Sequence, residues 1–162
     1  MIGRHTLTAK MSSIEHGRSL ASCAATLTDD LRDIDWERLA TVFERAPLGK
    51  RDAEVLRQSF TNSGVRCFAW AGRDLIGAGR AITDRARCAV ILDVVLLPEY
   101  QGKGIGKQMM TYLVERAKAA TILLYAVPGK EGFYQKFGFR KMKTAMGRFE
   151  DPEVRQQMGY IE

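Results

Sequence analysis

A glycine-rich segment near residue 100 is the part of the sequence best suited to bind a phosphate group. It follows the apolar run at 88–97 and consists of Gln101, Gly102, Lys103, Gly104, Ile105, Gly106 and Lys107. Glycines between a strand and a helix let backbone N–H groups approach a ligand closely, and a helix start carries partial positive charge. We therefore expect an anion-binding loop, to which Lys103 and Lys107 add charge. A tight turn without a ligand is the alternative.

Two common phosphate-binding loops do not fit this segment. A P-loop has the pattern G-x-x-x-x-G-K-[ST], but here Gln101 stands in place of the first glycine and Gln108 in place of the hydroxyl residue. A dinucleotide-binding fingerprint has the pattern G-x-G-x-x-G, but here the third glycine, Gly106, comes one residue early. Both patterns are therefore rejected.

The segment does fit the pattern Q/R-x-x-G-x-G/A, and a second motif lies downstream. Residues 133–139 read FYQKFGF, which fits Y-x-x-x-G-F from Tyr134 onward. The strand expected before the loop ends in VVLL and Pro98. With the long helix after the loop, these features resemble the GNAT superfamily of acyl-CoA-dependent N-acetyltransferases over about residues 65–149.

This resemblance implies where acetyl-CoA, as the co-substrate, would bind. Its pyrophosphate would lie on the backbone N–H groups of residues 101–106, close to Lys107. Its pantetheine arm would pair like a strand with the backbone of Val94, Val95 and Leu96. The resemblance also places Tyr134 at the general-acid position, although a tyrosine among phenylalanines is otherwise more typical of a core. No metal is implied.

The chemistry that the resemblance implies is attack of a neutral amine on a thioester. An amine like that of lysine has a pKa near about 10 and must first lose a proton. The departing thiolate must gain one, and a tyrosine with a pKa near about 10 suits that step. Val90 stands where some family members have a catalytic glutamate. Asp93, the ionisable residue of the apolar run, is the candidate base or amine anchor, with a purely structural carboxylate as the alternative.

The elements that must position these residues follow from periodicity. Trp36, Leu39, Ala40 and Phe43 share one helix face, which Asp33 or Asp35 would cap. Further helices are expected from Asp52 to about 60, at 104–120 and at 130–137, and strands at 19–28, 65–71, 75–83, 88–97, 121–127, 139–143 and 144–149. The fold class is therefore α/β, with a mixed central sheet flanked by helices in the order β-α-α-β-β-β-α-β-α-β-β.

The domain organisation is expected to be simple. Residues 1–18 are polar and patternless, so they are interpreted as a flexible leader, followed by one domain at 19–150 and a C-terminal tail at 151–162. Residues 103–148 contain ten Lys or Arg against two Glu, which favours a polyanionic ligand on that half. The helix pair at 33–62, with its acids and the loop Pro47-Leu48-Gly49, is expected to form the acceptor wall, and ordinary solvated residues are the favoured reading of the acids themselves.

Composition excludes several classes of protein. No apolar run approaches the roughly 20 residues that span a membrane, and no secretion signal is evident, so a cytoplasmic protein is expected. His5 and His16 precede every periodic segment, which argues against a catalytic triad or a histidine-ligated metal. Cys23, Cys67 and Cys88 are an odd, widely spaced set, interpreted as buried or half-buried residues without a disulfide framework.

The sequence therefore predicts an enzyme that acetylates a primary amine, of a small molecule or of a protein, by direct attack in a ternary complex with acetyl-CoA. A non-catalytic acyl-CoA-binding module of the same fold is the alternative, and Tyr134 argues against it. A nucleic-acid binder is disfavoured because no recognition motif accompanies the basic residues. Neither nucleic acid nor a membrane is expected as a partner, and a homodimer is left open.

Overall fold

The computed structural model describes residues 25–46 and 48–162. The leader predicted at 1–18, the first part of the strand predicted at 19–28, and Pro47 lie outside these residues. Of that first strand, the structure has the three residues of β1, Thr26–Thr28.

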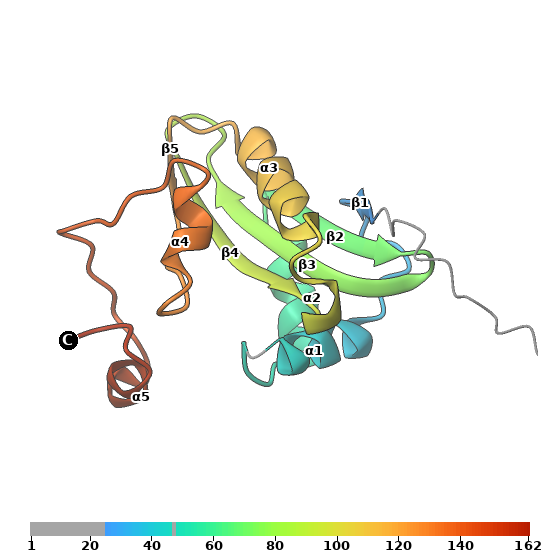
Figure 1. The fold of residues 1–162 in the computed structure, drawn as a ribbon, viewed down its shortest axis with the longest axis horizontal. Coiled ribbons are helices and arrows are strands. Elements are labelled where there is room, and N and C mark those ends of the chain that lie inside the picture. Colours follow the sequence, from blue (N-terminus) through green and yellow to red (C-terminus); the bar gives the residue numbers. More distant parts are fainter. Residues whose placement is uncertain (1–24, 47) are drawn as a thin grey trace, which may run out of the picture.

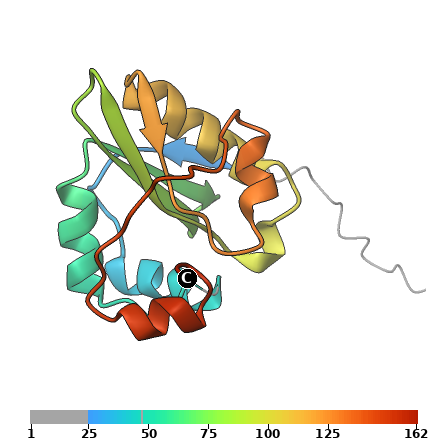
Figure 2. The same cartoon turned by 90° about the vertical axis from the view of Figure 1, so that its left-hand side faces the viewer.

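A five-stranded mixed sheet forms the centre of the fold, in the order β1-β2-β3-β4-β5 (Figure 1). Its further strands are β2 Val65–Ala71, β3 Asp74–Thr83, β4 Cys88–Leu96 and β5 Thr121–Leu123. Neighbouring strands are antiparallel except for β4 and β5, which run parallel. The α/β class with a mixed sheet is thus confirmed, and helices cover both faces of the sheet (Figure 2).

Helices α1 Trp36–Arg45 and α2 Ala53–Thr61 form one of these layers. Asp35 begins α1 by accepting a hydrogen bond from the N–H of Arg38 at 2.8 Å, and Asp52 caps α2 in the same way. The rings of Trp36, Phe60 and Phe68 pack between these helices and β2, with centroids 5.3 to 6.1 Å apart. This aromatic cluster fixes the helix pair against the sheet.

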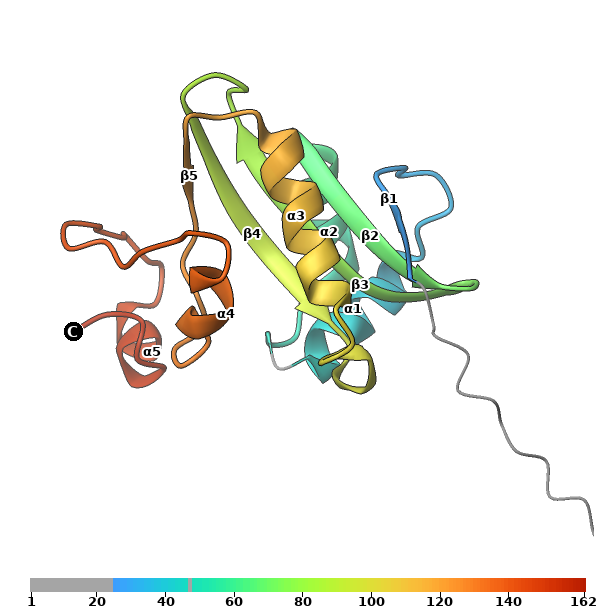
Figure 3. The ribbon, with the colours of Figure 1, turned by 45° about the horizontal axis from the view of Figure 1, so that its top comes forward.

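Helix α3, Ile105–Ala117, lies along the opposite face of β2, β3 and β4 (Figure 3). Its buried side chains include Ile105, Met109, Met110 and Leu113. A Cβ on Gly79 of β3 would come within 2.9 Å of Leu113 Cδ1, so the glycine permits the close approach of helix and sheet. The glycine-rich segment is thereby anchored at the carboxyl end of β4, before α3.

The structure differs from the sequence prediction after β5. That strand ends at Leu123 rather than 127, and the strands expected at 139–143 and 144–149 are absent. Residues 140–148 are all exposed, so they lack the alternating burial of a strand, and no neighbouring strand pairs with them. A short helix, α5 Pro152–Gln157, instead occupies the segment interpreted as a tail.

Two smaller expectations are settled by burial. Cys67 is buried in the core, whereas Cys88 is exposed at the start of β4, so the prediction that it is shielded was wrong. Cys23 lies outside the described residues. None of the helices that the structure describes is long and apolar enough to cross a membrane.

Candidate active site

A β-bulge in β4 shapes the middle of the site. Arg80 of β3 pairs with Leu92 and Ala78 pairs with Val95, so two residues of β4, Asp93 and Val94, oppose one residue of β3. Asp93 has φ 56°, a left-handed conformation that is costly outside glycine. The Nε of Arg80 donates a hydrogen bond to its Oδ2 at 2.5 Å, which helps to hold this conformation.

Strands β4 and β5 separate before the bulge is reached. They pair over three residues only, from Cys88 with Thr121 to Val90 with Leu123. Farther along, the edge of β4 that faces β5 has no strand partner among the described residues, and this stretch contains Val94, Val95 and Leu96. A gap of this kind leaves backbone groups available to an extended ligand.

The glycine-rich loop closes the end of this gap. Gly102 has φ 74° and Gly104 φ 83°, and a Cβ at either position would meet no atom within 4 Å. Gly104 is the N-cap of α3 and offers no side-chain acceptor, so the first N–H groups of the helix are left for a ligand. Gln101 Nε2 donates to the carbonyl of Leu96 at 2.8 Å, which ties the loop to β4.

The charged residues of the loop are exposed, whereas its apolar residue is buried. Lys103 and Lys107 are exposed beside the helix start, where they would add charge for an anion. Ile105 is buried in the core, so it offers a ligand its backbone and not its side chain. An anion at this loop would therefore meet backbone N–H groups and the two lysines.

Tyr134 is held by α4, Glu131–Gln135, and by neighbouring rings. Its ring makes edge contacts with Phe133, at 5.1 Å between centroids, and with Phe139, at 6.4 Å. Phe133 in turn lies against Gly106, at 3.5 Å from the position of a Cβ, so α4 is packed against the start of α3. Burial, and secondly the nearby Tyr160 phenol, raise the pKa of Tyr134, so the phenol keeps its proton at neutral pH.

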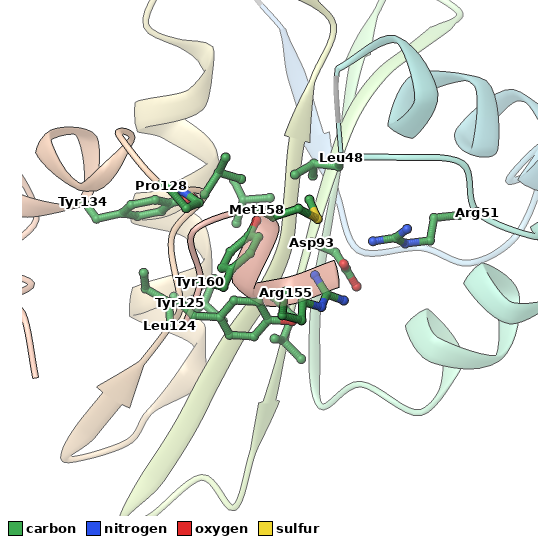
Figure 4. A pocket seen from close by; sticks show the side chains of 14 residues that line it. Leu48, Arg51, Asp93, Leu124, Tyr125, Pro128, Tyr134, Arg155, Met158 and Tyr160 are labelled. Atoms are coloured by element: carbon green, nitrogen blue, oxygen red, sulfur yellow. The ribbon is translucent and has the colours of Figure 1, made fainter. Parts of the chain in front are cut away.

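One cavity is lined by both predicted catalytic residues, Asp93 and Tyr134 (Figure 4). It lies between residues 91–94 of β4 and residues 124–128 after β5, where the two strands separate. In the view of Figure 4, Tyr134 is on one side and Asp93 on the other, with Tyr125 and Tyr160 drawn between them. Both groups therefore belong to the lining of one cavity.

Sequence reasoning missed other residues that line the cavity. They are Arg51, Tyr125, Arg155, Met158 and Tyr160. Leu48, of the loop expected in the acceptor wall, does line the cavity, together with Arg51. The acids of the helix pair do not line it, which agrees with the reading of them as solvated residues. Arg155 and Tyr160 belong to the segment interpreted as a tail. The sequence signal available for them was that this segment contains both an arginine and a tyrosine.

Comparison with known proteins now decides the family. The model of the GNAT acetyltransferase family matches residues 28–139, which is more than half of the chain. The chain belongs to the GNAT acetyltransferase family. The matched region includes the bulge, the glycine-rich loop and Tyr134.

Relatives of this chain in the family include algal and plant proteins. It is 40% identical over 99 residues to an uncharacterized N-acetyltransferase, ycf52, of Pyropia yezoensis, a match that covers 57% of each chain. It is 35% identical over 133 residues to serotonin N-acetyltransferase 2, chloroplastic, of Oryza sativa, covering 77% of this chain and 66% of the relative. The chain thus spans little more than half the length of the Pyropia relative.

Solved structures share the fold of the acetyltransferase. A probable acetyltransferase of Staphylococcus aureus superposes with a TM-score of 0.68 at 22% identity, over 77% of this chain and 97% of the other. A putative acetyltransferase of Deinococcus radiodurans gives a TM-score of 0.68 at 19% identity, over 79% and 90%. At these identities the likeness supports the fold and no particular substrate.

Proposed function

We propose that this acetyltransferase moves the acetyl group of acetyl-CoA to a primary amine by direct attack in a ternary complex. The observation that carries the proposal is the shared cavity of Asp93 and Tyr134, at the point where β4 and β5 separate. A thioester held in the gap would meet an amine in this cavity, beside a phenol that can supply a proton.

Acetyl-CoA fits the groups that the site offers. Its pyrophosphate would bind the N–H groups of the glycine-rich loop at 101–106, with Lys103 and Lys107 nearby. Its pantetheine arm would pair with the unpaired edge of β4 at Val94, Val95 and Leu96. Backbone N–H groups at the same edge would stabilise the oxyanion of the transition state.

Tyr134 is proposed as the general acid. Its raised pKa keeps it protonated at neutral pH, as donation to the departing thiolate requires. The non-catalytic acyl-CoA-binding module remains the alternative, but it has no use for a half-buried phenol facing the cavity.

Asp93 is proposed as the anchor of the acceptor amine. Arg80 occupies its Oδ2, while its Oδ1 has no hydrogen-bond partner among the described residues. Asp93 is also the one carboxylate lining the cavity in the described part of the chain. Oδ1 is therefore free to accept a hydrogen bond from the amine and orient its nitrogen toward the thioester.

The relatives support an amine acceptor without identifying it. The rice relative is named for serotonin, an amine. Several plant relatives are named as chloroplastic, so the cytoplasmic location predicted from the sequence stays a prediction. The same holds for the absence of nucleic acid, membrane and metal partners and for a homodimer.

The test is binding followed by turnover. Titration of acetyl-CoA into the protein by calorimetry should show binding, and addition of an amine panel should release free thiol. A neutral replacement of the loop lysines, Lys103→Gln with Lys107→Gln, should weaken binding. Lack of acetyl-CoA binding would overturn the proposal, and binding without thiol release from any amine would favour the non-catalytic module.

A further inference from the structure

Two arginines that are far apart in the sequence line the acceptor cavity. Arg51 belongs to the loop between α1 and α2, and Arg155 belongs to α5. In the view of Figure 4, their guanidinium groups lie on either side of the Asp93 carboxylate. Neither takes part in any of the five ion pairs that the described residues form.

The cavity therefore carries positive charge in excess. Asp93 is already paired with Arg80, so its charge is offset before Arg51 and Arg155 are counted. Both of these side chains are partly shielded from solvent, which reduces the screening of their charge by water. A ligand that enters the cavity meets two guanidinium groups, neither of which forms an ion pair among the described residues.

Arg155 is also held in place before any ligand arrives. Its guanidinium carbon lies 5.7 Å from the centre of the Phe149 ring and 5.5 Å from that of Tyr160. Tyr160 makes an edge contact with Tyr125 at 6.0 Å, so this arginine belongs to an aromatic cluster at the cavity. Contacts of this kind lower the entropy that a flexible arginine loses on binding.

An acceptor whose single charge is its ammonium group is poorly matched to this cavity, because two guanidinium groups repel it. Arginine forms paired hydrogen bonds with carboxylates and phosphates. We propose that the acceptor amine also carries a carboxylate or phosphate group, which binds Arg51 and Arg155 while the amine reaches Asp93. This assignment rests on the proposed function, and it excludes simple arylalkylamines as the preferred substrates.

Matched pairs of amines that differ in the anionic group test the assignment. Suitable pairs are tyramine with tyrosine, tryptamine with tryptophan, and glucosamine with glucosamine 6-phosphate. In at least one pair, we expect the member with the carboxylate or phosphate to exceed the member without it in kcat/KM by about tenfold or more. This is the effect of a hydrogen bond to a charged group. The first two pairs report on a carboxylate and the third on a phosphate.

Arginine variants test whether the cavity is responsible for that preference. Arg51→Gln and Arg155→Gln should each raise KM for the acceptor with the anionic group by about tenfold and leave KM for acetyl-CoA unchanged. For the acceptor without that group, KM should fall, because one of the two guanidinium groups that repel its ammonium is removed. Arg155→Lys should retain part of the preference, because it keeps the charge but loses the planar group. Arg57→Gln, on the exposed surface of α2 and paired there with Glu54, is the control and should change none of these values.

The outcomes separate this inference from the proposed function. If the amines without an anionic group are turned over at a kcat/KM equal to or higher than that of their partners, the inference is overturned and the proposed acetyltransferase activity is not affected. Binding of acetyl-CoA without turnover of any anionic member also overturns it, as does an arginine variant that impairs both members of a pair equally. Failure to bind acetyl-CoA overturns the proposed function itself, and the inference falls with it.

Discussion

Arg80 and Asp93 join the bulge of β4 to the sheet and to α2. The Nε of Arg80 donates to Oδ2 of Asp93 at 2.5 Å, and its Nη1 donates to Oγ of Ser63 at 3.3 Å. The Arg80 and Asp93 side chains are 14% and 24% exposed, so the pair is largely shielded. Because Ser63 lies two residues after the end of α2, this pair couples the conformation of the bulge to the position of the helix layer.

Arg80→Met should destabilise the fold because it leaves Asp93 without its partner in a shielded position. We expect the free energy of unfolding to fall by about 2 kcal/mol, between the values for exposed and buried pairs. Urea denaturation measures the loss. Arg32→Met removes an exposed ion pair with Asp30 and is the control, with little change expected. Equal losses in the two variants would contradict a structural role for the Arg80 pair.

Asp93→Asn should act on the acceptor and not on acetyl-CoA. The amide keeps the shape of the side chain but replaces a carboxylate acceptor with a weaker neutral one, so KM for the acceptor should rise by about tenfold. Steady-state kinetics with each substrate varied in turn separates the two KM values. If the pH dependence of kcat also lost its acidic limb, Asp93 would be the general base and the role of anchor would be wrong.

Tyr134→Phe should remove the proton donor and keep the ring packing with Phe133 and Phe139. We expect kcat to fall by about 100-fold or more, the usual contribution of a general acid, with the Kd for acetyl-CoA unchanged. Calorimetry and single-turnover thiol release measure the two quantities. Tyr125→Phe, which changes a more exposed tyrosine of the same cavity, is the matched control. A similar fall of kcat in both variants would contradict the role of Tyr134 as the general acid.

The pH dependence of kcat should report the same phenol. Burial raises the pKa of Tyr134, so the proton is retained at neutral and moderately alkaline pH and is lost only above the ordinary tyrosine value of about 10. Activity should therefore fall as the pH rises through that raised pKa. A pH–rate profile measured up to the onset of unfolding should show this basic limb in the wild type and lack it in Tyr134→Phe.

Gly104→Ala should separate strain from ligand binding. Gly104 has φ 83° with open space around a Cβ, so alanine introduces backbone strain of about 1 kcal/mol and no clash. Gly72→Ala, at φ 62° in the β2–β3 turn with equally open space, provides the matched control. Both variants should lose similar stability in thermal unfolding, and Gly104→Ala alone should raise the Kd for acetyl-CoA. An unchanged Kd for acetyl-CoA would show that the loop is not part of the binding site.

The side of the fold proposed to bind acetyl-CoA was predictable because local signals define it. The apolar β4, the glycines that follow and the amphipathic α3 each carry a pattern that short-range sterics and burial impose. The structure has β2 at the predicted bounds and β3 and β4 within one residue of them. Where these signals are strong, long-range packing reinforces the local preference.

The acceptor side was harder to predict because its residues meet only through the fold. Residues 140–148 are exposed, and nothing in their composition distinguishes an irregular exposed segment from an edge strand. Arg51 and Arg155 are distant in sequence and share no motif, so their meeting depends on how α5 lies against the cavity. The bulge at Asp93 likewise arises from the β3–β4 register, which a single strand sequence does not reveal.

The cavity wall made by residues 48–51 and 155–160 bears on how acceptor preference can be engineered. Both segments lie outside the glycine-rich loop and outside the β4 edge proposed for acetyl-CoA. Chimeras that carry these two segments from another member of the family would thus exchange the acceptor wall and keep the thioester-binding half intact. Such a two-segment graft offers a direct way to transplant selectivity between acetyltransferases of this fold.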